Sequence, residues 1–281
     1  MMKKAVLTTG VLTVLIAISA FLFYNVKADG KLDKKNYVQS TTPTLFFHGY
    51  GSSANAERHM TNAAKEAGVT KTVIRANVDR NGAVTLRGDI PKGAINPIVE
   101  VNYEDNRNPI DVGNYAKAVV SKLQEKYGFT KMNMVGHSLG NMSILYYLLE
   151  HAQDENLPQL QKQVNIANFA AGLEAMGLPS DVEVDKTTGQ PNQVTQTFQR
   201  LLPLREVFPQ NQIDVLNIYG DYKNGSDGSV LNASSRSLKY LVADNAKSYQ
   251  EKKIIGKLAQ HSQLHENPEV DKILIQFLWG K

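Results

Sequence analysis

The chain has 281 residues, of which 42% are hydrophobic and 21% are charged, and these values favour one globular domain of the larger kind over two small ones. It carries 31 Lys and Arg against 27 Asp and Glu, but Lys3, Lys4 and Lys27 lie within the first 28 residues, which contain no acid. The remaining chain is therefore close to neutral and offers no basic surface for a nucleic acid. The lack of cysteine excludes disulfides, thiolate metal sites and a cysteine nucleophile.

Residues 1–28 have the pattern of an export signal. Lys3 and Lys4 precede an uncharged, largely apolar run over residues 5–24, which is longer than an ordinary signal core and just long enough to cross a bilayer as one helix. Cleavage before Asp29 and retention as a membrane anchor both remain open. In either case the two lysines predict that the rest of the chain lies outside the cytoplasm, secreted or anchored to the cell membrane.

The expected elements alternate strands with helices. Short apolar or β-branched runs bounded by Gly, Pro or Asn predict strands, and longer runs with apolar residues at helical spacing predict helices. Asn81-Gly82 is a strong hairpin turn signal between two of the strands. In chain order, strands are expected at 44–47, 71–78, 83–90, 97–103, 132–135, 164–169, 213–219 and 253–258, and helices at 52–67, 111–127, 139–149 and 269–279.

This alternation predicts an α/β fold with a mostly parallel central sheet and helices on both of its faces. One domain is expected over residues 29–281. Between Gly172 and Gln212 the sequence is polar, rich in Gln, Thr and Pro, and without clean periodicity. Residues 173–212 are therefore expected to form an inserted cap or loop region over the edge of the sheet.

The segment Gly136-His137-Ser138-Leu139-Gly140 has the residues of a nucleophile elbow. It directly follows the apolar run at 132–135 and precedes an apolar helix. A serine on a sharp strand-to-helix corner needs glycine two positions away on either side, because side chains there would clash in so tight a turn. Ser138 is therefore the predicted nucleophile. His137, inside the elbow, is expected to pack rather than to transfer protons.

Two backbone amides are expected to stabilise negative charge beside Ser138. The helix that begins at Leu139 points its first amides and its positive dipole end to the place where an oxyanion would form. The second donor should come from the loop after the strand at 44–47, where His48-Gly49-Tyr50-Gly51 follows. The predicted oxyanion-hole donors are the N–H groups of Tyr50 and Leu139. His48 is expected to bond backbone groups and shape this turn.

A serine nucleophile also needs an imidazole base and a carboxylate that orients the imidazole. The loop after the strand at 213–219 contains Asp221 and Asp227. Asp227 is the preferred acid because it lies in a polar loop between a strand and a later histidine, where the third partner is required. Asp221 stays as the alternative.

The base should follow the last strand, where His261 and His265 compete. His261 is preferred because it lies nearest the end of the strand. His265 stays as the alternative, with packing against or capping of the final helix as its other role. The resulting order along the chain, Ser138, Asp227, His261, is that of α/β-hydrolases rather than that of chymotrypsin-like or subtilisin-like proteases.

Four motifs carry a family resemblance: Phe47-His48-Gly49-Tyr50-Gly51-Ser52, Gly136-His137-Ser138-Leu139-Gly140, Ser226-Asp227-Gly228-Ser229-Val230 and His261-Ser262-Gln263-Leu264-His265-Glu266-Asn267-Pro268. With them the chain resembles the α/β-hydrolases, and more narrowly the little-characterised cell-surface hydrolases of Gram-positive bacteria. The resemblance covers nearly all of the sequence after the N-terminal segment. In related lipases, the Asp of an Asp-Gly-x-Val stretch and the His seven residues before a Pro-Glu helix start complete the catalytic triad. The resemblance thus implies these roles for Asp227 and His261.

The sequence predicts a serine hydrolase that cleaves a carboxylic ester, as an esterase or lipase does, with a small-molecule or lipid ester as substrate. A peptidase, thioesterase or acyltransferase would use the same triad, and a non-catalytic envelope-binding module is the alternative from another class. No cofactor, metal ion or nucleic acid is expected as a partner. The N-terminal segment would contact the membrane if it is not cleaved.

Overall fold

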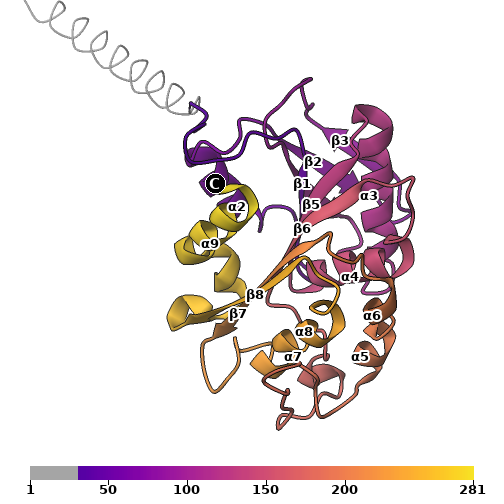
Figure 1. Ribbon diagram of the computed structural model, residues 1–281, viewed down its shortest axis with the longest axis vertical. Helices are drawn as coiled ribbons and strands as arrows, with labels where there is room; N and C mark the ends of the chain where they lie inside the picture. The colour runs from indigo at the N-terminus through magenta and orange to yellow at the C-terminus, as the bar shows by residue number, and fades with distance from the viewer. Residues whose placement is uncertain (1–30) are drawn as a thin grey trace, which may run out of the picture.

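The structure is a computed structural model that describes residues 31–281, so the export signal predicted for residues 1–28 lies outside the described part. Its centre is one eight-stranded sheet in the order β3-β2-β4-β1-β5-β6-β7-β8 (Figure 1). Neighbouring strands run parallel except β2 and β3, which form the predicted hairpin. The predicted mostly parallel sheet is confirmed. The strands are β1 (Thr44–Phe47), β2 (Val73–Val78), β3 (Val84–Arg87), β4 (Ile98–Tyr103), β5 (Lys131–His137), β6 (Gln159–Ile166), β7 (Asp214–Asp221) and β8 (Ser248–Ile255).

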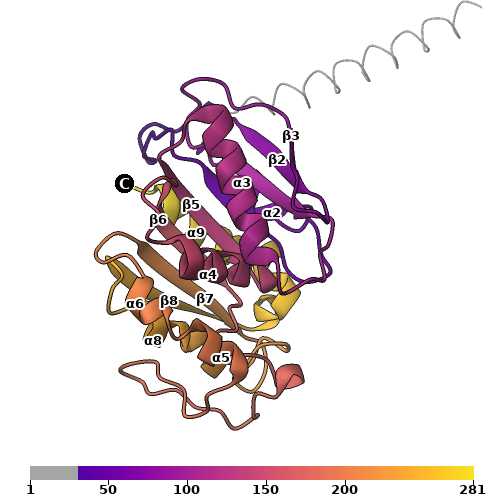
Figure 2. The ribbon, with the colours of Figure 1, turned by 90° about the vertical axis from the view of Figure 1, so that its right-hand side faces the viewer.

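Helices cover both faces of the sheet, as the α/β pattern predicts (Figures 1 and 2). Helices α2 and α9 pack on one face, and α3 to α8 pack on the other. The helices are α2 (Arg58–Glu66), α3 (Val112–Tyr127), α4 (Leu139–His151), α5 (Gln196–Leu201), α6 (Leu204–Val207), α7 (Asn232–Arg236), α8 (Leu238–Val242) and α9 (Pro268–Trp279). The described residues also form the short 3₁₀ helices η1 (Glu174–Met176), η2 (Lys257–Ala259) and η3 (His261–Glu266).

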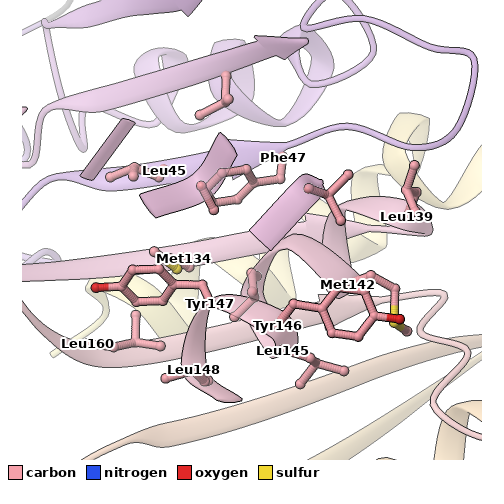
Figure 3. Close-up of a cluster of buried hydrophobic side chains, with 14 of the residues drawn as sticks. Leu45, Phe47, Met134, Leu139, Met142, Leu145, Tyr146, Tyr147, Leu148 and Leu160 are labelled. Carbon is pink, nitrogen blue, oxygen red and sulfur yellow. The ribbon is translucent and has the colours of Figure 1, made fainter. Parts of the chain in front are cut away.

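Alternate side chains of the central strands enter two separate apolar cores. In β1, Leu45 and Phe47 belong to the core beneath α3 and α4, whereas Phe46 belongs to the core beneath α2 and α9. Figure 3 shows part of the larger core, in which Met134 of β5 and Leu145 of α4 accompany the β1 side chains. Because successive side chains of a strand point to opposite faces, a strand buried on both sides reads as an unbroken apolar run. That is why β1 and β5 are found where the sequence predicts them.

Three predicted elements start at least five residues away from their place in the structure. The pattern places the last strand at 253–258, whereas β8 starts at Ser248, because this edge strand is half exposed and has no long apolar run. The strand predicted at 164–169 starts five residues earlier, since the first half of β6 is polar. The helix predicted at 52–67 begins only at Arg58, because the preceding residues form the loop that leads away from β1.

Residues 173–212, the predicted cap region, connect β6 to β7 and consist of two parts. The first part, up to Thr195, contains η1 and a β-bridge between Val184 and Pro191 but is otherwise irregular, and it projects from the lower end of the molecule in Figure 2. The second part forms α5 and α6, whose Phe198 and Leu204 are buried in the core beneath α4. Only the first part therefore lies outside the helical layers.

Glu57 is a buried carboxyl group that directly precedes α2. Within the part of the chain that the structure describes, neither of its side-chain oxygens has a hydrogen bond. Burial is the main reason that its pKa is raised well above that of an ordinary Glu, and the nearby Glu100 and Glu266 raise it further. Glu100 accepts hydrogen bonds from Thr61 at 2.8 Å and Arg75 at 2.9 Å. The charge of Glu100 is thus compensated, which leaves Glu57 as the neutral member of the pair.

Replacing Glu57 with Gln is expected to stabilise the protein increasingly as the pH rises. The folded state keeps a proton that the unfolded chain releases above its ordinary pKa of 4.5. Wild-type stability therefore falls from that pH up to the folded pKa, by about 1.4 kcal/mol per pH unit. Gln is neutral throughout and removes this slope. Urea unfolding between about pH 5 and pH 8 measures the difference.

Glu104 provides the control for this measurement, since it is an exposed Glu paired with Arg80 at 3.3 Å. Glu104→Gln is expected to keep the wild-type slope. If Glu57→Gln also kept the full wild-type slope, the assignment of a buried, neutral Glu57 would be contradicted.

Candidate active site

The predicted site residues lie on loops that leave one edge of the sheet. Tyr50 follows β1, Ser138 follows β5, Asp227 follows β7 and His261 follows β8. These strands run parallel, so their carboxyl ends meet at the same edge, which is where open α/β sheets bind ligands. The topology thereby brings Ser138 within hydrogen-bond distance of His261, which lies 123 positions further along the sequence.

Ser138 has a strained backbone at the corner between β5 and α4. Its φ is 52° and its ψ is −119°, a conformation that costs a non-glycine residue about 1–3 kcal/mol. A Cβ added at Gly136 would lie 2.6 Å from the backbone carbon of Gly140, and one added at Gly140 would collide with the backbone oxygen of Phe47. Both glycines are therefore required by close backbone contacts, which is the physical reason for the elbow motif.

Asn141, in the first turn of α4, supports this corner from inside. Its side-chain Nδ2 donates to the carbonyl oxygens of Ser138 at 2.9 Å and Ile166 at 2.8 Å. The N–H of Ser138 donates to the same Ile166 oxygen at 3.0 Å. These bonds tie the strained residue to the end of β6. Sequence reasoning misses Asn141, because it lies outside the Gly-x-Ser-x-Gly pattern and its burial is visible only in the fold.

Ser138, His261 and Asp227 form one hydrogen-bonded line. Nε2 of His261 lies 3.0 Å from Oγ of Ser138, and its Nδ1 lies 2.8 Å from Oδ2 of Asp227. A carboxylate only accepts hydrogen bonds, so Nδ1 carries the proton and Nε2 accepts from the serine hydroxyl. The backbone N–H of His261 also donates to the carbonyl oxygen of Asp227 at 2.8 Å. The imidazole is thus oriented to take the proton of Ser138.

The carboxylate of Asp227 is almost completely buried, and backbone amides compensate for its lost hydration. Its Oδ1 accepts hydrogen bonds from the N–H groups of Ser229 at 2.8 Å and Val230 at 2.7 Å, while Oδ2 faces His261. Such donors are what a buried carboxylate requires. The Asp-Gly turn supplies them, because an Asp side chain bonds readily to amides two and three residues further on. The sequence indicates the Asp-Gly turn but not which two amides donate to the carboxylate.

The alternative acid, Asp221, and the alternative base, His265, contact other residues. Asp221 ends β7 and forms an ion pair with Lys253 of β8 at 2.5 Å. His265 packs edge-on against the ring of His137, with the ring centroids 4.7 Å apart. Neither Asp221 nor His265 has a side-chain hydrogen bond to Ser138 or to the imidazole of His261. The structure thus brings together the preferred members of each pair and not the alternatives.

His137 packs beside the site as a neutral ring. Its Nε2 lies 3.0 Å from the carbonyl oxygen of His261 and donates to it, because a carbonyl only accepts. Burial is the main reason that the pKa of His137 is well below that of an ordinary histidine, and the neighbouring His261 and His265 lower it further. His137 therefore supports the backbone of His261 without bringing a charge into the site.

Two backbone N–H groups beside Ser138 are available to a ligand. A Cβ added at Gly49 would lie 3.2 Å from Cβ of Ser138, so the following amide, that of Tyr50, lies next to the nucleophile. Leu139 is the first residue of α4, and its N–H has no acceptor within the helix. In the part of the chain that the structure describes, neither N–H donates a hydrogen bond to another protein group. Both N–H groups lie near the N-terminus of α4, where the positive end of the helix dipole also favours negative charge.

His48 bonds backbone groups on both sides of its ring. Its Nε2 accepts the N–H of Tyr103 at 3.1 Å, and its Nδ1 lies 2.9 Å from the carbonyl oxygen of Gly49. Since Nε2 accepts, Nδ1 is the nitrogen that carries the proton and donates. Burial lowers the pKa of His48 below the ordinary value.

The assembled groups are those of acyl transfer: a hydroxyl, an imidazole that can accept its proton, a carboxylate that orients the imidazole, and two amides for an oxyanion. Over residues 31–281, no group of three or more His, Asp or Glu side chains is arranged to hold a metal ion.

Comparisons with known proteins agree with this architecture. The product of the gene lin2722 of Listeria innocua has a crystal structure that superposes with a TM-score of 0.75, at 26% identity over 85% of this chain and 94% of that one. A Lactobacillus plantarum protein assigned as a cell surface hydrolase superposes with a TM-score of 0.67, at 20% identity over 84% of this chain and 89% of that one. No curated protein sequence is significantly similar to the chain.

A family model matches most of the chain. The model described as "Alpha/beta hydrolase of unknown function (DUF915)" matches residues 31–281, which is the whole of the part that the structure describes. The resemblance expected from the four sequence motifs is confirmed at this level. The chain therefore belongs to this family of α/β hydrolases.

Proposed function

We propose that the protein is a serine hydrolase that cleaves a carboxylic ester through an acyl-enzyme on Ser138. The observation that carries the proposal is the hydrogen-bonded line from Asp227 through His261 to Ser138, with distances of 2.8 Å and 3.0 Å. Two further features support the proposal. The strained corner presents Ser138 at the start of α4, and the N–H groups of Tyr50 and Leu139 have no acceptor among the described residues.

The reaction follows from these positions. Ser138 Oγ attacks the ester carbonyl carbon while His261 Nε2 takes the hydroxyl proton, and Asp227 stabilises the imidazolium that forms. The carbonyl oxygen becomes an oxyanion that accepts hydrogen bonds from the amides of Tyr50 and Leu139. When the bond to the alcohol breaks, Nε2–H gives its proton to the leaving oxygen. A water molecule then attacks the acyl-enzyme, His261 accepts its proton, and release of the acid returns a proton to Ser138.

Exposed apolar side chains on the same edge of the sheet support an ester with an apolar acyl or alcohol group. Within residues 31–281, and apart from Val194, five large exposed hydrophobic residues lie in the segments after the carboxyl ends of β1, β4, β6, β7 and β8, which flank the β5 corner on both sides. Apolar side chains around a reactive group favour apolar substrates through burial of surface. These residues are Tyr50, Ile110, Met176, Tyr222 and Leu258.

Turnover of p-nitrophenyl esters by the purified full-length chain tests the proposal. Hydrolysis is expected to increase from acetyl to octanoyl esters and to fall to the background rate in Ser138→Ala. Matched p-nitroanilides and thioesters, with and without alcohol acceptors, distinguish ester hydrolysis from peptidase, thioesterase and acyltransferase activity. Unchanged ester turnover in Ser138→Ala would contradict the proposal, and faster turnover of an amide or thioester would change the substrate class. Specific envelope binding by an inert wild type would instead favour a binding module.

The proposed location is outside the cytoplasm, either secreted or anchored to the cell membrane by the N-terminal segment. Its support is the pair Lys3 and Lys4 before the apolar run, together with the cell-surface assignment of the Lactobacillus plantarum protein. Among residues 31–281, no helix is both long and apolar enough to span a bilayer. Protease accessibility of the chain on intact Gram-positive cells, compared with its presence in the medium, tests the location and the fate of the segment.

A further inference from the structure

The loop after β1 is a tight turn whose first peptide group carries the amide proposed for the oxyanion. The N–H of Ser52 donates to the carbonyl oxygen of Gly49 at 3.3 Å, which closes a turn over Gly49–Ser52. Gly51, the third residue of this turn, has a φ of 65°, the left-handed conformation that glycine adopts without strain. The carbonyl oxygen of Gly49 and the N–H of Tyr50 belong to one planar, trans peptide group. They therefore point in opposite directions, and whatever fixes the oxygen also aims the N–H.

His48 holds that oxygen through a chain of two hydrogen bonds. The N–H of Tyr103, at the end of β4, donates to Nε2 at 3.1 Å and so places the ring proton on Nδ1. Nδ1 then donates to the oxygen of Gly49 at 2.9 Å. The ring is 1% exposed and lies 5.3 Å from the ring of Tyr103, so packing also restricts its rotation. The bond from the side chain is shorter than the 3.3 Å bond from Ser52, and the sheet anchors its other end.

We propose that His48 is a positioning residue for the oxyanion hole: its Nδ1–H fixes the Gly49–Tyr50 peptide so that the N–H of Tyr50 faces the carbonyl oxygen of the substrate. This role rests on the proposed function of Ser138. It differs from a merely structural role because it affects the binding of a tetrahedral oxyanion more than the binding of the ground-state ester.

Two substitutions of His48 separate the two hydrogen bonds. In His48→Asn the side-chain amide can still donate to Gly49 from the position of Nδ1, but the acceptor for Tyr103 is lost. In His48→Gln an oxygen can still accept from Tyr103 near the position of Nε2, but the donor to Gly49 is lost. Each variant loses one bond, so the two are expected to lose similar thermal stability.

The measured quantities are kcat and KM for a p-nitrophenyl ester and the inhibition constant of phenylboronic acid, which forms a tetrahedral adduct with a serine oxygen. Loss of an oxyanion donor costs roughly 100- to 1,000-fold in kcat, so a misaimed donor in His48→Gln is expected to cost about 10- to 100-fold. The affinity for the boronic acid should fall in parallel, while KM stays close to its wild-type value. His48→Asn is expected to keep most of the wild-type kcat and most of the wild-type affinity for the boronic acid.

Tyr50→Pro deletes the proposed oxyanion donor itself, at a turn position that accepts proline. It should lose more affinity for the boronic acid than Tyr50→Ala.

One further measurement leaves the protein intact. Nitrogen-15 NMR of labelled histidine in the wild type is expected to show His48 with its proton on Nδ1. A proton on Nε2 would overturn the role, and so would folded Gln and Asn variants with equal kcat and equal boronic acid affinity. A wild type that neither hydrolyses esters nor binds the boronic acid would overturn the proposed function and this role with it. An active wild type with an equally active His48→Gln would overturn the positioning role alone.

Discussion

Replacing His261 with Ala is expected to lower kcat for ester hydrolysis by on the order of 10⁵- to 10⁶-fold. Among residues 31–281, the His261 imidazole is the one group bonded to the hydroxyl of Ser138, at 3.0 Å. Without it, the proton of that hydroxyl loses its acceptor during the attack. Stopped-flow measurement of p-nitrophenol release separates acylation from later steps, and circular dichroism confirms that the variant is folded.

His265→Ala is the matched control for this substitution, because His265 lies four residues further along and packs against His137 without a hydrogen bond to Ser138. It is expected to keep most of the wild-type kcat and to lose some stability. Comparable losses in the two variants, or a His261→Ala protein that still turns over rapidly, would contradict the assignment of the base.

Asp227→Asn is expected to lower kcat by about 10⁴-fold with little change in the fold. An Asn at this position can offer its oxygen to the amides of Ser229 and Val230, which leaves its NH₂ group facing Nδ1 of His261. The imidazole would then carry its proton on Nε2, where it can no longer accept from Ser138. Kinetics of p-nitrophenyl acetate hydrolysis at neutral pH measure the loss.

Asp221→Asn gives the comparison for this second prediction. Asp221 is the last residue of β7, six positions before Asp227, and its partner is Lys253 and not the imidazole. Its substitution is expected to remove a partly exposed ion pair worth at most about 1 kcal/mol and to leave kcat close to wild type. A large loss of kcat in Asp221→Asn, together with a mild loss in Asp227→Asn, would reverse the assignment of the acid.

The sequence predicts the centre of the fold better than its edges. The strands β1 and β5 are buried on both sides, so each reads as a short, mostly apolar run; the first stops at His48-Gly49 and the second at Gly136. The edge strand β8 is half exposed and mixes polar with apolar residues, so the predicted run is displaced toward its carboxyl end. Helices α7 and α8 are not predicted. Each has only five residues, too few to show a helical spacing. The buried Ser234 and Ser235 of α7 donate to the carbonyl oxygens of Gly172 and Asn168, contacts that only the fold shows.

The candidate site shows the same division. The corner at Ser138 is predictable because the glycines on either side are demanded by steric contacts that any tight strand-to-helix turn has. The positions of Asn141 and Glu57 are not predictable, since an Asn within a helix and a Glu before one are usually solvated. Only the tertiary structure shows that both are fully buried, Asn141 against the ends of β5 and β6 and Glu57 near Glu100.

The role of His48 can be predicted only in part from the sequence. Its place after β1 predicts a histidine that shapes a turn. Which backbone groups it bonds depends on β4, whose last residue, Tyr103, supplies the N–H to Nε2. A neighbouring strand far along the chain thus determines which ring nitrogen of His48 faces Gly49, and a single sequence carries no signal for that.

Labelling with a fluorophosphonate probe tests the central claim most directly, because the probe reacts with a serine only when a base and an oxyanion site activate it. Wild type and Ser138→Ala are compared with Ser262→Ala, which removes an exposed hydroxyl next to His261. We expect one equivalent of probe per chain, located on Ser138 by peptide mass spectrometry, with labelling lost in Ser138→Ala and kept in Ser262→Ala. A folded wild type that takes up no probe, or an adduct on another serine, would contradict the account.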